Sequence, residues 1–304
     1  METLNKIIED IICCPNCKAG IEYNKGVLSC LLCKSVFRFH DGILIMMPRG
    51  VEKSQDKERE VREKVANEHG AEDIEKIYKV IKKHHCMPVM IAKADEYRKR
   101  FTNDQWVVDV GCGSGYYWKN SKPGAKLILI DFAMSNLKAA RIILKDTEDI
   151  LFVQADASCM PLKENSISGI WSVQVTQHFP DIVMKKFLDE LKRILKKNYF
   201  IEVYNLNPDM MHRFVYGLFG KKFHIKGQYG DMLQNKLNSK ELLVLWDKFL
   251  GESEYKIMFS ELFFHPNFKI FPQSKIIPIL ERILDIFPLF TKLFARQISI
   301  NIKS

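Results

Sequence analysis

The sequence has no long hydrophobic run, and no apolar stretch approaches the roughly 20 residues that a membrane-spanning helix needs. Segment 1–10 lacks the pattern of a signal peptide, because acidic and polar side chains interrupt the apolar ones. Disordered, collagen-like and coiled-coil chains are also excluded, since 47% of the residues are hydrophobic and 27% are charged, as in globular proteins. We therefore expect a cytoplasmic protein whose 304 residues form one large domain or two smaller ones.

The excess of positive charge is a weak guide to function. The chain has 46 Lys and Arg residues against 37 Asp and Glu residues, a net charge of +9. A basic chain is compatible with a nucleic acid or an anionic surface as its partner. The total does not say where the charges lie, so it selects neither partner.

The cysteines are concentrated near the N-terminus, and five of the eight lie between Cys13 and Cys33. Four of them form two C-x2-C pairs with twelve residues between the pairs, namely Cys14, Cys17, Cys30 and Cys33. Two such turns brought together present four thiolates as a tetrahedron, which Zn²⁺ prefers. Disulfide bonds are the competing interpretation, but a chain without a secretory signal stays in a reducing compartment. We therefore predict a structural zinc ion with no open coordination position, for which Cys13 is a spare thiol.

Residues 1–48 are expected to form a small β-rich domain around this metal. Turn residues at 24–26 and 41–42 separate short alternating segments and predict two strand pairs. From Leu4 through the cysteines to residues 37–43, the segment resembles the zinc-ribbon domain of the small activator subunit that partners tRNA and protein methyltransferases. The resemblance implies a docking and stabilising module rather than a catalyst.

The remainder of the chain has the pattern of a larger α/β domain. Residues 49–68 carry many charges of both signs and predict a solvated linker. Short apolar segments then alternate with stretches of helical periodicity, which is typical of a parallel sheet with helices on both faces. The expected strands are residues 106–110, 127–130, 150–153, 170–173, 199–203, 255–262 and 297–302. We therefore predict that residues 69–304 form a seven-stranded, Rossmann-like sheet with insertions near 205–238 and 263–296.

A glycine-rich turn follows the first of these strands, because Gly111, Gly113 and Gly115 come directly after it. Glycine lets a ligand approach the main chain closely, and ligands of such sheets bind at the carboxyl ends of the strands. Acidic residues lie at or near the ends of the first three strands, namely Asp109, Asp131 and Asp156. Asp131 is suitably placed to accept hydrogen bonds from two ribose hydroxyls.

This combination resembles the class I S-adenosylmethionine-dependent methyltransferases over residues 106–203. The resemblance implies that Asp109 and the glycine turn hold the amino-acid part of the methyl donor, while Asp131 binds its ribose. It also implies that Asp156 and Ala157 recognise the adenine, and it places Gln174 among the donor-binding residues. The segment after the fourth strand lacks the N-P-P-Y type signature and a cysteine nucleophile, which lowers the case for a DNA or glutamine acceptor.

Methyl transfer from a sulfonium is an in-line displacement, in which the protein aligns the reactants and excludes water. A general base is needed only where the acceptor is a weak nucleophile. His178, near the end of the fourth strand, is the candidate base. The alternative is a histidine that caps the next helix or packs beside Phe179.

The sequence does not identify the methyl acceptor. Residues 205–238 interleave aromatic and basic side chains, which suits either stacking on bases or a lid over a small molecule. Residues 275–296 are amphipathic with basic flanks, which suits peripheral membrane association, a lid or a dimer face. We favour a small-molecule, sugar or lipid-linked glycan acceptor; the alternative is an rRNA or tRNA methyltransferase whose zinc ribbon docks RNA. The oligomeric state is not predicted, and zinc removal is expected to unfold the ribbon and leave donor binding largely intact.

Overall fold

The computed structural model describes residues 2–24, 26–50, 59–60, 63, 86–119, 121–206, 239–250, 253–258, 283, 286–287 and 297–304. Most of the predicted linker (49–68) and most of both predicted insertions (205–238 and 263–296) lie outside these residues. The boundaries that the sequence suggested for the domains therefore stay a prediction.

The N-terminal segment, which we call the ribbon, is a helix followed by two antiparallel hairpins. Its elements are α1 (Glu2–Ile11), β1 (Ile21–Asn24), β2 (Val27–Cys30), β3 (Val36–His40) and β4 (Ile43–Ile45). The second hairpin turns at Asp41 and Gly42, both of which have positive φ, as the Asp-Gly pair predicts. The β-rich module expected around the cysteines is confirmed.

Seven strands form the sheet of the larger part. They are β5 (Trp106–Val110), β6 (Lys126–Asp131), β7 (Ile150–Gln154), β8 (Ile167–Val173), β9 (Leu195–Leu206), β10 (Ser253–Met258) and β11 (Gln297–Lys303). Their order across the sheet is β7-β6-β5-β8-β9-β11-β10. The first five are parallel, and β11 runs antiparallel to both of its neighbours. The seven-stranded α/β sheet predicted from the sequence is confirmed.

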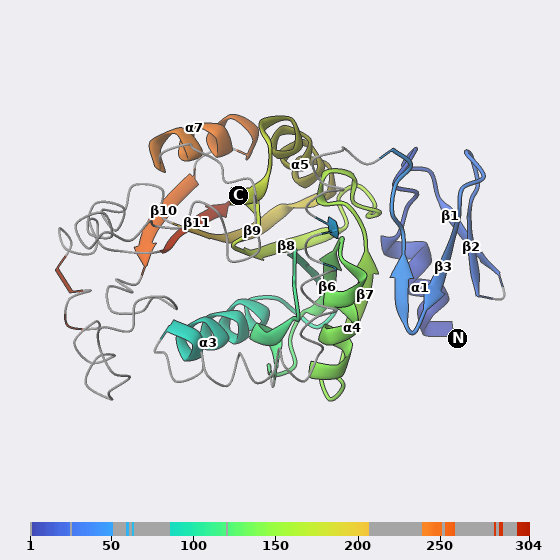
Figure 1. Cartoon of the computed structure of the whole chain (residues 1–304), viewed down its shortest axis with the longest axis horizontal. Coiled ribbons are helices and arrows are strands. Elements are labelled where there is room, and N and C mark those ends of the chain that lie inside the picture. Colours follow the sequence, from blue (N-terminus) through green and yellow to red (C-terminus); the bar gives the residue numbers. More distant parts are fainter. Residues whose placement is uncertain are drawn as a thin grey trace.

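The ribbon continues this sheet. Strand β4 pairs in parallel with β7, with Ile43 opposite Phe152 and Ile45 opposite Gln154. The four ribbon strands and the seven strands of the larger part therefore make one eleven-stranded sheet (Figure 1). The sequence did not predict this continuity, because pairing between distant edge strands leaves no periodic signal in either segment.

Helices cover both faces of the sheet in the larger part. They are α3 (Cys86–Lys99), α4 (Met134–Ile143), α5 (Asp181–Ile194) and α7 (Ser239–Leu250). Helices α3 and α4 lie on one face and α5 and α7 on the other (Figure 1). Strand β5 is consequently buried along its whole length. None of the described helices combines the length and the apolar character that crossing a membrane requires.

The hydrophobic core on the α5 face includes the ribbon. Ile8 and Ile12 are buried in the same cluster as Phe187 and Leu191 of α5. An isolated β-bridge also joins Ile12 to Leu162. Since full burial of one such side chain contributes about 1.5–3 kcal/mol, this shared core stabilises the ribbon and the larger part together.

Candidate functional site

The chain changes direction across the sheet at β5. It moves from β5 to β6 and β7 on one side, and then places β8 and β9 on the other side. The loops that follow β5 and β8 therefore diverge, and open α/β sheets bind their ligands at this position. The predicted donor-binding residues lie at strand ends or in loops on this edge: Asp109, Gly111, Gly113, Gly115, Asp131, Asp156, Ala157 and Gln174.

The three glycines of the loop all have left-handed backbone angles, with φ of 68°, 53° and 63° at Gly111, Gly113 and Gly115. A Cβ atom on Gly111 would lie 2.4 Å from Cγ2 of Val175, which is closer than atoms can pack. A Cβ on Gly113 would meet no described atom within 4 Å. The loop is thus closed by packing at Gly111 and open at Gly113, where a ligand can approach the main chain. Beside it, the buried Ser114 Oγ has no hydrogen-bond partner among the described residues.

Asp109 lies beneath this loop and is almost completely buried. Its Oδ2 accepts a 2.6 Å hydrogen bond from Nε1 of Trp118, in the 3₁₀ turn η1 (Tyr116–Trp118). Burial raises the pKa of Asp109 to about 7 and the negative charge of Asp131 adds to the rise, while the bond from Trp118 opposes it. The site therefore contains a carboxyl group that changes its charge near neutral pH.

Asp131 connects the glycine loop to helix α4. Its Oδ2 accepts a bond of 2.9 Å from the Gly113 amide. Its Oδ1 accepts bonds of 2.9 Å from the Ala133 amide and 3.2 Å from Nδ2 of Asn136. These bonds hold the Asp131 carboxylate in a fixed orientation between the glycine loop and the start of α4.

Asp156 follows β7 and caps the short turn η2 (Ala157–Cys159). Its Oδ1 accepts bonds of 2.8 Å from both the amide and the hydroxyl of Ser158. Capping is the structural role that a strand-end aspartate commonly has, and it holds the carboxyl group in a defined orientation. Asp156 and Ala157 lie at the predicted edge of the sheet, next to the end of β7.

The segment after β8 contains the remaining predicted residues. Gln174 is a non-glycine residue with positive φ (57°), and its amide donates to the carbonyl of Tyr204 at 2.7 Å. His178 ends the 3₁₀ turn η3 (Thr176–His178) and is buried. Its Nε2 lies 3.2 Å from Nε2 of Gln177. The structure therefore places His178 after β8, as predicted, with its ring nitrogen in a polar contact.

The four paired cysteines come together in the ribbon. Their sulfur atoms all lie within 4.8 Å of one another, with 3.5 Å between Cys14 and Cys33 and 3.4 Å between Cys17 and Cys30. Zinc bound to sulfur at about 2.3 Å in a tetrahedron requires sulfur atoms about 3.8 Å apart, so the cluster fits the ion. Cys13 points elsewhere, and its Sγ donates to the carbonyl of Leu162 at 3.0 Å.

The first cysteine turn packs against the loop that follows β7. Cys13 donates its amide to the Pro161 carbonyl at 3.0 Å, and the Lys163 amide donates to Ile11 at 2.8 Å. The Cys159 thiol donates to the Pro15 carbonyl at 2.7 Å. The ribbon thus holds residues 159–163, the continuation of the turn that Asp156 caps.

One lysine joins the two parts electrostatically. Nζ of Lys18 lies 2.9 Å from Oε2 of Glu190 and donates to the Met160 carbonyl at 3.2 Å. Arg193 also pairs with Glu190, at 2.8 Å, and donates to the carbonyl of Leu162 at 2.7 Å. Lys34, at the matching position after the second cysteine pair, donates only locally, to the Leu31 carbonyl.

Sequence reasoning missed four residues near the site. Trp118 bonds to Asp109, Lys18 and Glu190 connect the ribbon to the larger part, and Glu63 bonds to the start of α4. Each of them contacts a residue on another element, and neither periodicity nor motif spacing predicts such a contact. Only Trp118, three positions after the glycine turn, offered a signal, since a large side chain there must pack close to the loop.

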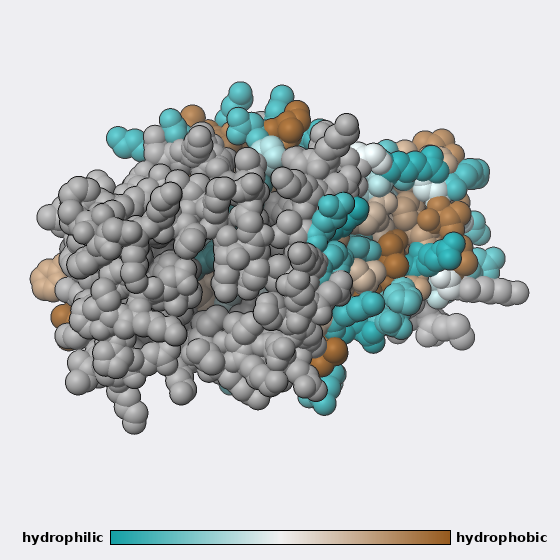
Figure 2. Space-filling model, in the orientation of Figure 1, coloured by the Kyte–Doolittle hydropathy of each residue, from teal (hydrophilic) through white to brown (hydrophobic). Residues whose placement is uncertain are grey.

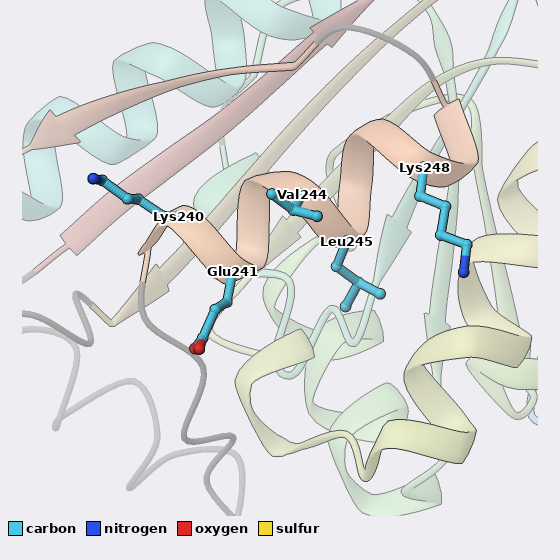
Figure 3. Close-up of a pocket in the computed structure, with 5 residues that line it drawn as sticks. All are labelled: Lys240, Glu241, Val244, Leu245 and Lys248. Carbon is cyan, nitrogen blue, oxygen red and sulfur yellow. The ribbon is translucent and has the colours of Figure 1, made fainter.

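A hollow of about 370 Å³ lies elsewhere, along helix α7. It is lined by Lys240, Glu241, Val244, Leu245 and Lys248, all from that helix (Figure 3). None of these residues is at the carboxyl edge of the parallel strands. We therefore do not assign the chemistry to this hollow.

Comparison with known proteins agrees with this geometry. Residues 108–201 match a family described as a methyltransferase domain. A chain from the complex between the Haloferax volcanii Trm112 methyltransferase activator and a methyltransferase is 18% identical, with a TM-score of 0.50 over 73% of this chain and 91% of that one. A SAM-dependent methyltransferase from Archaeoglobus fulgidus is 15% identical, with a TM-score of 0.48, and the match covers 75% of this chain and 99% of that one. No curated protein matches the sequence. Residues 108–201 thus match a methyltransferase domain, and they follow an N-terminal ribbon that holds the four-cysteine cluster.

Proposed function

We propose that the protein transfers a methyl group from S-adenosylmethionine to a small-molecule, sugar or lipid-linked acceptor. The observation that supports this most is the edge of the sheet at β5, where a left-handed glycine loop lies beside Asp109 and Asp131. The open backbone at Gly113 and the unpartnered hydroxyl of Ser114 fit a ligand that bonds to the main chain and to a small polar group.

The proposed donor lies across three strand ends. Asp109 and the glycine loop would hold its amino-acid part, and Asp131 would accept from its ribose hydroxyls. Asp156 and Ala157 would contact its adenine, with Gln174 on the other side of β5. Fixing one ligand at three strands aligns its reactive end relative to the sheet, which is the main requirement of a displacement reaction.

When bound, the donor supplies a methyl group on a positively charged sulfur, so the carbon is already activated. The residues of this chain then contribute orientation and exclusion of water. Asp109, when ionised, would also attract the ammonium group of the amino-acid part. No covalent intermediate with a protein side chain is required by this chemistry.

His178 is proposed as the general base for a hydroxyl acceptor, and this role is tested by His178→Asn. Turnover at pH 7 should fall about 100-fold with little change in donor affinity, because a positioned base contributes roughly this factor. The measurement is the pH dependence of turnover for both proteins. A variant with unchanged turnover and an unchanged pH profile would remove His178 from the mechanism and leave it a packed residue.

The ribbon is proposed to bind one structural zinc ion through Cys14, Cys17, Cys30 and Cys33. Four thiolates complete the coordination of the metal, so it would contribute folding energy and no chemistry. The Haloferax volcanii structure holds an activator and a methyltransferase as a complex. In the present chain the ribbon is covalently continuous with the methyltransferase domain and extends its sheet. We therefore propose a built-in stabilising module.

An RNA acceptor is the second candidate, and the ribbon surface argues against it. Lys18 is engaged by Glu190 and does not extend toward a nucleic acid. The outer face of the ribbon exposes apolar side chains, and the exposed ones are Val27, Leu31, Leu32 and Val36. Figure 2 shows this surface as a mixture of hydrophobic and hydrophilic patches. A phosphate-binding surface would instead need a continuous set of free cations.

The proposal is tested by donor binding followed by product identification. Calorimetry with S-adenosylhomocysteine on zinc-loaded protein should show one site per chain, and a folded sample without measurable affinity would refute the donor assignment. Cell extract incubated with the protein and labelled S-adenosylmethionine should then carry label in the lipid or soluble fraction. Label confined to RNA would instead establish the second candidate. Exposed apolar residues at Ile283, Ile286 and Phe287, within the segment proposed for membrane contact, make the lipid fraction the first to examine.

A further inference from the structure

Helix α4 begins without a capping side chain of its own. Its N-cap residue is Ala133, which has the extended backbone of a capping position (φ −90°, ψ 116°) and no side-chain acceptor. The first amides of any α-helix lack partners within the helix, and Ser, Thr, Asp or Asn normally supplies one at this position. The amides at the start of α4 therefore need an acceptor from elsewhere.

Glu63 supplies it from 71 residues away in the sequence. Its Oε1 accepts a 2.6 Å hydrogen bond from the amide of Met134, and its Oε2 accepts one of 3.2 Å from the amide of Ser135. Both carboxylate oxygens are thus used on the first turn of one helix. A negative charge at this position also interacts favourably with the helix dipole.

Asp131, which is proposed to bind the ribose of the donor, contacts the start of the same helix. Oδ1 of Asp131 accepts from Ala133, the residue directly before Met134, and Oδ2 accepts from Gly113 in the glycine loop. Two carboxylates, one local and one remote, therefore hold residues 131–135 from both sides. Loss of the remote one releases the start of α4, and Asp131 is bonded to that start.

From these contacts, and given the donor site proposed above, we propose that Glu63 is a positioning residue of the donor site. It sets the geometry of Asp131 through the first turn of α4 and does not touch the donor. This assigns a role to a residue of segment 49–68, which the charge pattern alone had predicted to be a solvated linker. Arg59 and Glu60 are the other described helical residues of this segment, and Glu60 is exposed.

The test compares Glu63→Ala with Glu60→Ala, its exposed neighbour. S-adenosylhomocysteine and 5′-methylthioadenosine are titrated into zinc-loaded full-length protein, because the second ligand keeps the ribose and adenine and lacks the amino-acid part. Glu63→Ala should weaken both ligands by the same factor, about five-fold, as expected from loss of a charged helix cap. Glu60→Ala should match the wild type, and Glu63→Gln, which keeps one acceptor oxygen, should fall between them.

A second substitution separates positioning from direct contact. Ala133→Ser in the Glu63→Ala background places a local cap at a residue that already has capping geometry, and it should restore most of the lost affinity. If affinity is not restored in this folded double variant, Glu63 does not act through the helix start, and the proposal is overturned. It is also overturned if Glu63→Ala binds both ligands like the wild type, or weakens only S-adenosylhomocysteine.

Different results would refute the donor site and the positioning role of Glu63. Absence of S-adenosylhomocysteine binding by the wild type would refute the donor site itself. Normal binding by the wild type together with unchanged binding by Glu63→Ala would refute only the positioning role. If Glu63→Ala does not fold, Glu63→Gln carries the comparison, and wild-type affinity for both ligands in that variant would count against the proposal.

Discussion

Removal of zinc is expected to lower the affinity for S-adenosylhomocysteine at least ten-fold, in addition to unfolding the ribbon. A four-thiolate site folds with its metal, so a chelator removes the order of the first cysteine turn. That turn holds residues 159–163 through bonds to Cys13, Pro15 and Lys18. The loop is continuous with Asp156, the proposed adenine contact, and it would lose these partners.

This expectation reverses the one that the sequence suggested. A ribbon separated from the donor site by a charged linker would leave donor binding intact when it unfolds. In the structure, β4 pairs with β7, the strand that leads directly to Asp156. The ribbon and the donor edge are therefore neighbours through the sheet, although the chain between β4 and β7 is long.

Two matched lysines test the connection without removing metal. Lys18 and Lys34 each follow a cysteine pair and each has a left-handed backbone, with φ of 62° and 57°. Lys18→Met should weaken binding of S-adenosylhomocysteine about ten-fold, because Glu190 and the Met160 carbonyl lose their charged donor from the ribbon and keep Arg193, which belongs to the larger part. Lys34→Met should have no effect, because Lys34 donates to the Leu31 carbonyl within its own turn.

The measurements are calorimetry for the donor analogue and spectroscopic titration for zinc content. By thermodynamic linkage, S-adenosylhomocysteine should in turn slow extraction of zinc by a chelator. Equal donor affinity in zinc-loaded protein, zinc-free protein and Lys18→Met would show that the ribbon is a separate stabilising module, as the sequence alone had suggested.

The affinity for S-adenosylhomocysteine is also expected to rise about ten-fold between pH 6 and pH 8, through the titration of Asp109. Burial raises the pKa of this carboxyl to about 7 in the protein without ligand. The ionised form attracts the ammonium group of the ligand and the protonated form does not. Binding should therefore release a proton near pH 7, which calorimetry detects as a dependence of the enthalpy on the buffer.

The same group gives stability the opposite pH dependence. The pKa of Asp109 is higher in the folded protein than in the unfolded chain, so the folded protein retains a proton that the unfolded chain releases. Its contribution to the free energy of unfolding is thus fully present below pH 4 and is lost as the pH rises through about 7. Asp109→Asn has no titrating proton and should abolish both effects. A pH dependence of binding that persists in a folded Asp109→Asn protein would assign it to another group.

Part of this protein is determined by local sequence. The glycines at 111, 113 and 115 have positive φ, as a close-approach turn needs, and the seven strands follow from alternating apolar and helical segments. The spacing of the two cysteine pairs likewise predicts the four-sulfur cluster that the structure contains. Each of these features is encoded within a few residues, because backbone conformation and periodicity are local properties.

Only the tertiary structure decided how these pieces act on one another. The ribbon joins the sheet through β4 and β7, and Glu63 caps a helix whose own N-cap position holds Ala133. The pKa of Asp109 near 7 follows from its burial and from the nearby charge of Asp131, against the opposing bond from Trp118. No sequence pattern predicts the strand pairing, the remote helix cap or the shifted pKa, since each depends on which surfaces meet after folding. The local turns and strand ends at this edge of the sheet are therefore predictable from the sequence, whereas the long-range contacts that hold them are not.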